Sequence, residues 1–249
     1  MTLEMVAMKL LVSPKNVDEA NEAIKGDCDI VDCKNPEEGS LGANFPWVIQ
    51  EMKAAISSSQ KFGIQLSATI GDMPYLPGTA SLAAAGLATM GVDYIKVGVH
   101  GPKTKDQARK LLENIVRATK DVDDKIFVVA AAYADYKRIK TSIPPLDLVD
   151  VAAEAGCNVV MVDTAIKDAK GLMDFMDHDE ISRFCSKGEQ AGLLVALAGR
   201  LKMQDIPFLK TTGASIIGVR SMVCQGFDRL NGAIDASLVK QVKELLAVE

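Results

Sequence analysis

The sequence predicts an α/β protein that folds as a single (β/α)8 TIM barrel. Two observations predict it: the chain contains eight short apolar runs rich in β-branched residues, and a helix-compatible segment follows each of them. Parallel strands need such helical crossovers, and a closed ring of strands leaves no exposed sheet edge. The length of 249 residues suits one barrel, and no Ser/Gly-rich or Pro-rich linker divides the chain. We expect one domain over residues 1–249, with residues 1–7 as a short N-terminal extension.

Each strand is expected where an apolar run ends in a polar or glycine-containing turn. The predicted strands are residues 8–14, 28–36, 62–72, 94–101, 126–135, 158–168, 193–200 and 216–222. The intervening segments are amphipathic or alanine-rich, and several end in glycine, which tolerates the left-handed conformation at a helix C-terminus. The predicted helices are residues 16–26, 44–57, 79–91, 104–120, 144–156, 178–192, 203–213 and 237–249.

A doubly wound open sheet is the alternative architecture, because it also alternates strands and helices. Its first strand-to-helix turn would be expected to be rich in glycine. The turn after the first predicted strand reads VSPKN and contains no glycine. The sequence therefore favours the closed barrel.

Charge and hydropathy patterns exclude several functional classes. Twenty-eight basic residues against thirty-three acidic ones give a net charge of −5, so no global field attracts nucleic acid or an anionic membrane. The uncharged stretch 73–92 contains prolines and glycines and is rich in alanine, which predicts a buried helix and no membrane span. The N-terminus carries Glu4 and lacks a basic region ahead of a long apolar stretch, so we expect no signal peptide and a cytoplasmic location.

Cysteine and histidine usage predicts no metal site. The five cysteines include no C-x-x-C pair and are expected to be reduced thiols, mostly in the core. The two histidines, His100 and His178, are too few for a histidine-rich site. The sequence also lacks a Walker A motif, G-x-G-x-x-G and G-x-S-x-G, so we expect no cofactor.

Polar residues gather at the C-terminal ends of the predicted strands, the end at which barrels of this kind carry out chemistry. Asp32 and Lys34 are two residues apart and share a face, so both are expected to point into the barrel mouth while Val31 and Cys33 pack outward. Lys167 is expected at or beyond the end of its strand. The full set is Ser13, Asp32, Lys34, Thr69, Asp72, Lys96, His100, Tyr133, Asp135, Asp163, Lys167, Arg200 and Arg220.

The convergence of lysines and aspartates predicts Schiff-base chemistry. A partly buried lysine beside other positive charges loses its proton near neutral pH and attacks a carbonyl, and an adjacent carboxylate then moves protons. By position, Lys34, Lys96 and Lys167 all qualify as the nucleophile. The competing interpretation is a set of ion pairs that only complete the core, although buried ion pairs often add little stability.

Two glycine-arginine turns predict a phosphate site. They read ALAGR after the seventh strand and IIGVRSM after the eighth, and loops after these two barrel strands often cradle phosphate. Gly199 and Gly218 would let the backbone approach the anion. Arg200 or Arg220 would add charge-assisted hydrogen bonds.

The run KNPEEGSLGANFPW at residues 34–47 resembles a known family, (5-formylfuran-3-yl)methyl phosphate synthase, also called 4-(hydroxymethyl)-2-furancarboxaldehyde-phosphate synthase, of methanofuran biosynthesis in methanogenic archaea. The resemblance extends over nearly the whole chain through LLVSP, SAT-x-GD-x-PY-x-PGT, DYIKVG, DTAIKD, DFMD and the final GVR. It implies a barrel enzyme that condenses two molecules of glyceraldehyde 3-phosphate with loss of phosphate and water.

The resemblance also implies individual roles. Lys34 would be the Schiff-base lysine and Lys96 a proton acceptor, while Asp32, Asp163 and Lys167 would assist proton transfer or hold substrate. The expected partner is a phosphorylated triose, and apolar residues along the helix predicted at 79–91 favour a homo-oligomer. The alternatives are a class I aldolase for another phosphorylated sugar and a non-catalytic barrel that binds a phosphorylated metabolite.

Overall fold

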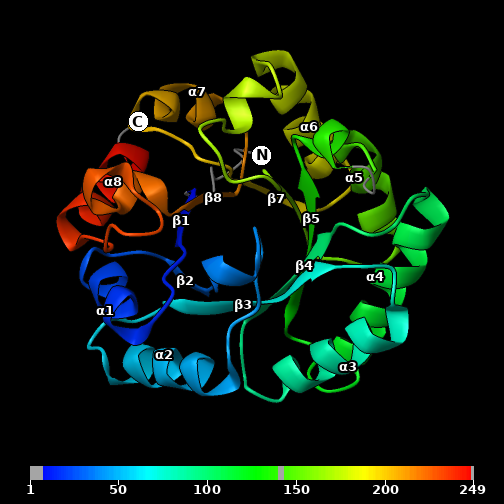
Figure 1. The fold of residues 1–249 in the computed structure, drawn as a ribbon, viewed down its shortest axis with the longest axis horizontal. Coiled ribbons are helices and arrows are strands. Elements are labelled where there is room, and N and C mark those ends of the chain that lie inside the picture. Colours follow the sequence, from blue (N-terminus) through cyan, green and yellow to red (C-terminus); the bar gives the residue numbers. More distant parts are fainter. Residues whose placement is uncertain (1–7, 140–142, 248–249) are drawn as a thin grey trace, which may run out of the picture.

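Eight parallel strands close into a ring in chain order, β1 to β8, and the helices α1 to α8 lie around it (Figure 1). This computed structural model describes residues 8–139 and 143–247, so the predicted extension at 1–7 lies outside the described residues. The barrel prediction is confirmed. All eight strand pairs of the ring are parallel, including the closing pair of β1 and β8.

The strands are β1 Lys9–Val12, β2 Ile30–Cys33, β3 Gln65–Met73, β4 Tyr94–Val99, β5 Phe127–Tyr133, β6 Val159–Asp163, β7 Leu194–Leu197 and β8 Ile216–Val219. The helices are α1 Val17–Lys25, α2 Pro46–Ser58, α3 Pro77–Ala88, α4 Lys105–Lys120, α5 Pro145–Glu154, α6 His178–Gln190, α7 Ile206–Thr211 and α8 Ala236–Ala247. Short 3-10 helices are η1 Pro36–Glu38, η2 Tyr136–Arg138, η3 Leu172–Asp174, η4 Met203–Asp205, η5 Ser221–Val223 and η6 Gln225–Phe227.

Most strands end earlier than the sequence predicts, because their polar C-terminal residues belong to the loops at the barrel mouth. Lys34 directly follows β2, and Lys167 lies four residues past the end of β6, as expected. The helix predicted at 203–213 is shorter, with η4 followed by the six-residue α7.

Local sequence explains where several helices begin. The Asn16 side chain accepts a hydrogen bond from the Glu19 N–H and caps α1. Asp177 and Glu180 cap α6 reciprocally. In α4, Ala108, Leu111, Leu112, Ile115 and Thr119 recur at helical spacing and are buried.

Apolar side chains form two separate layers, one inside the ring and one between the strands and the helices. Ile30 of β2 belongs to the inner layer, whereas Val31 and Cys33 belong to the outer one. Asp32 and Lys34 therefore face the barrel interior, which confirms the prediction from strand alternation. All five cysteines are free and buried, as expected.

Within the described part of the chain, no helix combines the length and apolar character needed to cross a membrane. On the outer surface, Phe45 and Trp47 stack on each other and are exposed, and Leu82 of α3 is exposed too. The expected homo-oligomer stays a prediction.

The loop after β2 folds back over the barrel mouth and closes part of it. Leu41 at its tip is fully buried in the inner layer, and the Thr69 hydroxyl donates a hydrogen bond to the Leu41 carbonyl. The Asp72 carboxylate accepts hydrogen bonds from the Ser40 and Leu41 N–H groups and from the Tyr133 hydroxyl. The irregular register of β3 with β4 between Thr69 and Asp72 brings that carboxylate to this loop.

Glycine at position 98 makes room for the Tyr133–Asp72 contact. A Cβ at this position would overlap Tyr133 Oη and lie 2.6 Å from Asp72 Oδ1. The Gly98→Ala substitution is therefore expected to lower the free energy of unfolding by about 1–3 kcal/mol, as overpacking does elsewhere. Urea unfolding followed by circular dichroism measures it.

Gly86→Ala in α3 is the matched control, since an added Cβ there meets no atom within 4 Å. It is expected to leave stability unchanged or raise it by up to about 1 kcal/mol through helix propensity. Equal effects of the two substitutions would contradict the packing argument.

Candidate active site

A pocket that is partly open to solvent lies at the carboxyl ends of the strands; it encloses about 610 Å³ of empty space when open solvent is included. Eight of the residues singled out in the sequence line it: Ser13, Lys34, Asp163, Lys167, Gly199, Arg200, Gly218 and Arg220. Asp32 and Lys96 are not among its lining residues and are almost completely buried within the barrel.

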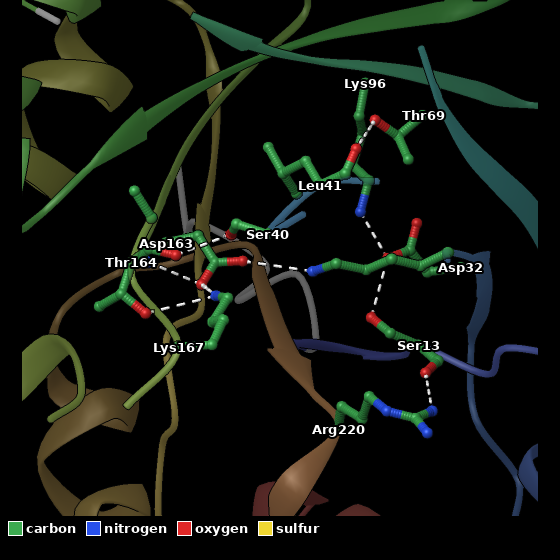
Figure 2. Close-up of polar contacts among 12 residues, drawn as sticks. Ser13, Asp32, Ser40, Leu41, Thr69, Lys96, Asp163, Thr164, Lys167 and Arg220 are labelled. Carbon is green, nitrogen blue, oxygen red and sulfur yellow. Dashed lines mark hydrogen bonds and ion pairs between the residues drawn. The ribbon is translucent and has the colours of Figure 1, made fainter. Parts of the chain in front are cut away.

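Asp163 connects two of the lysines. Its Oδ1 lies 2.6 Å from Lys167 Nζ and its Oδ2 lies 3.5 Å from Lys34 Nζ. The Thr164 N–H also donates to Oδ1 at 2.7 Å, which fixes the carboxylate (Figure 2). Lys34 is therefore held at the pocket wall by one long ion pair, with 8% of its side chain exposed.

Burial changes the pKa of the Lys34 amine. It lowers the pKa of Lys34 from 10.5 to about 7, because the buried site penalises the charged ammonium form. Asp163 opposes this shift, whereas the positive charges of Lys167 and Lys96 add to it. Near neutral pH, a large fraction of Lys34 is therefore an uncharged amine.

The partners of Lys34 respond differently to the same environment. Burial by itself raises the pKa of Asp163, but Lys167 and Lys34 outweigh it and hold that pKa below its ordinary value. Burial lowers the pKa of Lys167, and Asp163 counteracts it. Asp163 therefore rests as a carboxylate. It can accept a proton from a group in the pocket, but it holds that proton only briefly.

The second cluster lies beneath the pocket. Lys96 Nζ is 2.5 Å from Asp32 Oδ2, and both side chains are 1% exposed. The Ser13 hydroxyl donates to the same carboxylate oxygen at 2.8 Å (Figure 2). The other oxygen, Asp32 Oδ1, is buried and has no hydrogen-bond partner among the described residues. A buried carboxylate oxygen without a hydrogen bond costs free energy, so this pair is under polar strain.

The turn after β7 exposes backbone donors to the pocket. Gly199 and Arg200 have φ values of +107° and +50°, and a Cβ on Gly199 would lie 3.2 Å from Thr164 Cγ2. Neither residue's N–H donates a hydrogen bond to any other described residue. Gly218 of β8 also lines the pocket without a side chain. Free backbone N–H groups at this place suit an anion.

Arg220 is engaged mainly in structural contacts. Its guanidinium forms an ion pair with Glu19 at 2.6 Å and also donates to the carbonyls of Ser13 and Arg229. It lines the pocket, so its role in phosphate binding stays a prediction.

Sequence reasoning did not single out Arg229 or the Ser40–Leu41 tip of the β2 loop. Arg229 lies in an irregular segment after β8 with no period or motif to mark it, yet it lines the pocket. Ser40 donates to the Thr164 carbonyl at 2.7 Å and links the loop to the Asp163 side of the site. The glycines of EEGSLG were the sequence signal that could have marked the loop tip. Glycine is needed at position 39, because a Cβ there would lie 2.5 Å from Asp72 Oδ2.

No group of three or more His, Cys, Asp or Glu side chains in the described ranges is arranged to hold a metal ion. His178 stacks on Phe208, and His100 lies edge-on against Tyr133.

Fold and site together define the class: a (β/α)8-barrel enzyme with a buried lysine–aspartate cluster at the carboxyl ends of its strands. The family model described as 4-HFC-P synthase matches residues 10–243, and the chain belongs to this family.

Curated relatives carry the name (5-formylfuran-3-yl)methyl phosphate synthase. The one from Methanocaldococcus jannaschii is 51% identical over 238 residues, which cover 96% of this chain and 99% of that protein. The one from Methanosarcina barkeri is 53% identical over 240 residues, which cover 96% of this chain and all of that protein. The family resemblance inferred from the sequence motifs is thereby confirmed.

Solved structures with the same barrel are distant in sequence. A 3-hexulose-6-phosphate synthase superposes with a TM-score of 0.66 at 18% identity, covering 96% of this chain and 100% of that one. KGPDC from Streptococcus mutans gives 0.64 at 11% identity, covering 96% of this chain and 97% of that one. These likenesses support the fold alone.

The charges around Lys34 predict opposite effects of two substitutions. Asp163→Asn removes the negative charge that favours the ammonium form, so the pKa of Lys34 is expected to fall further. Lys167→Met removes a positive charge and frees Asp163 for Lys34, so the pKa of Lys34 is expected to rise. The pH midpoint of Lys34 acetylation by acetic anhydride, followed by peptide mass spectrometry, measures both.

Lys103→Met is the control, because Lys103 is exposed on the surface and does not line the pocket. It is expected to leave the midpoint unchanged. Midpoints that move in the same direction in Asp163→Asn and Lys167→Met would contradict this account of the electrostatics.

Proposed function

We propose that the enzyme condenses two molecules of glyceraldehyde 3-phosphate into (5-formylfuran-3-yl)methyl phosphate through a Schiff base on Lys34. One observation carries the proposal: a lysine amine with a pKa of about 7 lies at the wall of an open pocket lined with cations and free backbone donors. The printed names of the curated relatives support the same product.

The first step is imine formation. The uncharged Lys34 amine attacks the aldehyde carbon of one triose phosphate, and the carbinolamine then loses water to give a protonated imine. Since burial lowers the pKa of the amine to about 7, no strong base is needed to generate the nucleophile. The positive iminium then withdraws electrons from the neighbouring carbon.

The second step is elimination of phosphate. A base takes the proton from the carbon next to the iminium, the electron pair forms a carbon–carbon double bond, and the bond from the third carbon to phosphate breaks. Phosphate leaves with the electrons of that bond. Because the iminium stabilises the developing negative charge, Lys34 itself supplies the electron sink that this step requires.

The remaining steps join the two trioses and close the ring. A carbon–carbon bond forms between them, an oxygen of one closes onto the other, and hydrolysis of the imine releases Lys34. Two triose phosphates equal the furan product, one phosphate and two waters, so the atoms balance without an oxidant or reductant.

The other charged residues have roles that follow from their positions. Lys96 and Asp32 form one proton-exchange pair beneath the pocket, with Lys96 as proton acceptor. Asp163 and Lys167 form another beside the Lys34 amine and carry protons through the carbinolamine. Gly199, Gly218 and Arg200 bind phosphate, and Arg220 mainly braces the loop that follows β8.

The proposal includes a place in metabolism and a partner. The product is the furan precursor of methanofuran, and the substrate is a phosphorylated triose with no metal ion or other cofactor. A class I aldolase is the second candidate, because it would use the same amine; it would release neither inorganic phosphate nor a furan that absorbs ultraviolet light. A barrel that only binds a phosphorylated metabolite would trap no imine.

Lys34→Ala is expected to abolish trapping by borohydride and to lower furan formation by at least about a thousandfold, because it removes the nucleophile. The measurements are the mass of the reduced adduct after incubation with glyceraldehyde 3-phosphate, and the ultraviolet absorbance of product. Lys103→Ala removes the same charge from an exposed site and is expected to leave both unchanged.

An adduct on Lys96 or Lys167 of the wild-type enzyme would overturn the assignment of Lys34 and keep the enzyme class. The absence of any adduct, together with normal binding of substrate, would overturn the Schiff-base proposal.

A further inference from the structure

Positive charge exceeds negative charge in the pocket although the whole chain carries −5. Six basic side chains line it, and only Asp163 and Asp168 oppose them. Three ion pairs balance four of these charges: Arg220 pairs with Glu19, Lys167 pairs with Asp163, and Asp168 pairs with Arg138 outside the pocket. Arg200 and Arg229 form no ion pair with any described residue.

Arg229 is held in place but its guanidinium is free. Its carbonyl accepts a hydrogen bond from Arg220 Nε at 2.8 Å, which fixes the backbone of the segment. The side chain is only partly exposed and makes no hydrogen bond with any other described residue. Burial lowers the pKa of Arg229, and nearby Arg220 and Arg200 act in the same direction against Asp163. Half-burying an unpaired guanidinium is unfavourable unless an anion joins it.

Arg200 lines the same pocket as Arg229. Its guanidinium carbon lies 5.0 Å from the centre of the Phe227 ring, and its Nε is buried without a hydrogen-bond partner in the described chain. Phe227, like Arg200, has a positive φ, so both ends of this contact are fixed by unusual backbone turns.

Both arginines lie where two pockets meet. The first pocket contains Lys34 and the glycines Gly199 and Gly218. The second, lined by the β2 loop and the segment after β8, opens beside it with a volume of about 1220 Å³ including open solvent. Their shared residues are Lys167, Asp168, Arg200 and Arg229, so three of the four shared side chains are cations.

We infer that Arg229, together with Arg200, forms a second phosphate subsite that holds the second triose phosphate in the adjoining pocket. The free Gly199 N–H, beside the side-chain-free Gly218, holds the phosphate of the triose bound to Lys34. This inference rests on the proposed function, since only a reaction of two phosphorylated trioses needs two phosphates bound at once. Each phosphate carries about −1.5 to −2 at pH 7, and the arginines between them offset their repulsion.

The two trioses are the same compound, but two measurements separate them. Borohydride trapping on Lys34 reports the first triose alone, whereas furan formation requires both. In Arg229→Gln, the half-saturating concentration of glyceraldehyde 3-phosphate for furan formation is expected to rise about ten- to hundredfold, the loss typical of charged hydrogen bonds. The half-saturating concentration for trapping is expected to change less than about threefold.

Arg183→Gln is the matched control, because it removes one arginine from the exposed surface of α6, away from both pockets. It is expected to change neither concentration. Arg229→Lys is expected to fall between wild type and Arg229→Gln, since lysine keeps the charge and loses the two-pronged geometry.

A parallel rise of both half-saturating concentrations in Arg229→Gln would place Arg229 at the first triose and overturn the inference. An unchanged half-saturating concentration for furan formation would also overturn it. Should wild type form no furan, the proposed function fails, and calorimetric titration with inorganic phosphate then decides the subsite. Two phosphates per chain in wild type and one in Arg229→Gln support it, whereas equal numbers in both proteins overturn it.

Discussion

The site depends on the competition between burial and ion pairing at the Lys34 amine. Burial lowers the pKa of Lys34 to about 7. Its ion-pair partner among the described residues is Asp163, whose Oδ2 lies 3.5 Å from Lys34 Nζ and whose Oδ1 lies 2.6 Å from Lys167 Nζ. A closer and unshared Asp163 would keep Lys34 charged, because one short buried pair stabilises the ammonium strongly. Lys96 is arranged differently, since Asp32 lies 2.5 Å away as its own partner. The two lysines of the barrel thus differ in geometry: Lys34 shares a distant carboxylate with Lys167, whereas Lys96 has a close carboxylate of its own.

The scaffold maintains this difference through the loop after β2. Leu41 enters the barrel and covers its interior, while the Asp72 carboxylate accepts hydrogen bonds from the loop tip and from the Tyr133 hydroxyl. Ser40 joins the same tip to Thr164, whose N–H fixes the Asp163 carboxylate. The geometry at Lys34 is therefore coupled to packing several residues away, and the free cations and backbone donors of the rim let an acidic protein attract phosphate locally.

The sequence predicted the features that depend on chain periodicity. Alternation along β2 placed Asp32 and Lys34 inside the barrel and Cys33 outside, because a strand reverses its faces at every residue. Which lysine pairs with which aspartate was not predictable, since that depends on side chains from different strands meeting across the ring. The engagement of Arg220 with Glu19 was hidden for the same reason, as Glu19 lies on α1 and is far away in sequence. Arg229 was missed because irregular loops carry no period, and only their folded path shows what they face.

The most direct test of this account is the titration of Lys34 itself. Nuclear magnetic resonance of protein labelled with ¹⁵N and ¹³C in lysine, with the Lys34 signal assigned by its loss in Lys34→Arg, reports the ammonium directly at each pH. The account predicts a pKa of about 7 in the enzyme without substrate. A pKa near the ordinary value of 10.5 would mean that Lys34 is a charged partner in an ion pair at neutral pH, and the proposed nucleophile would be contradicted.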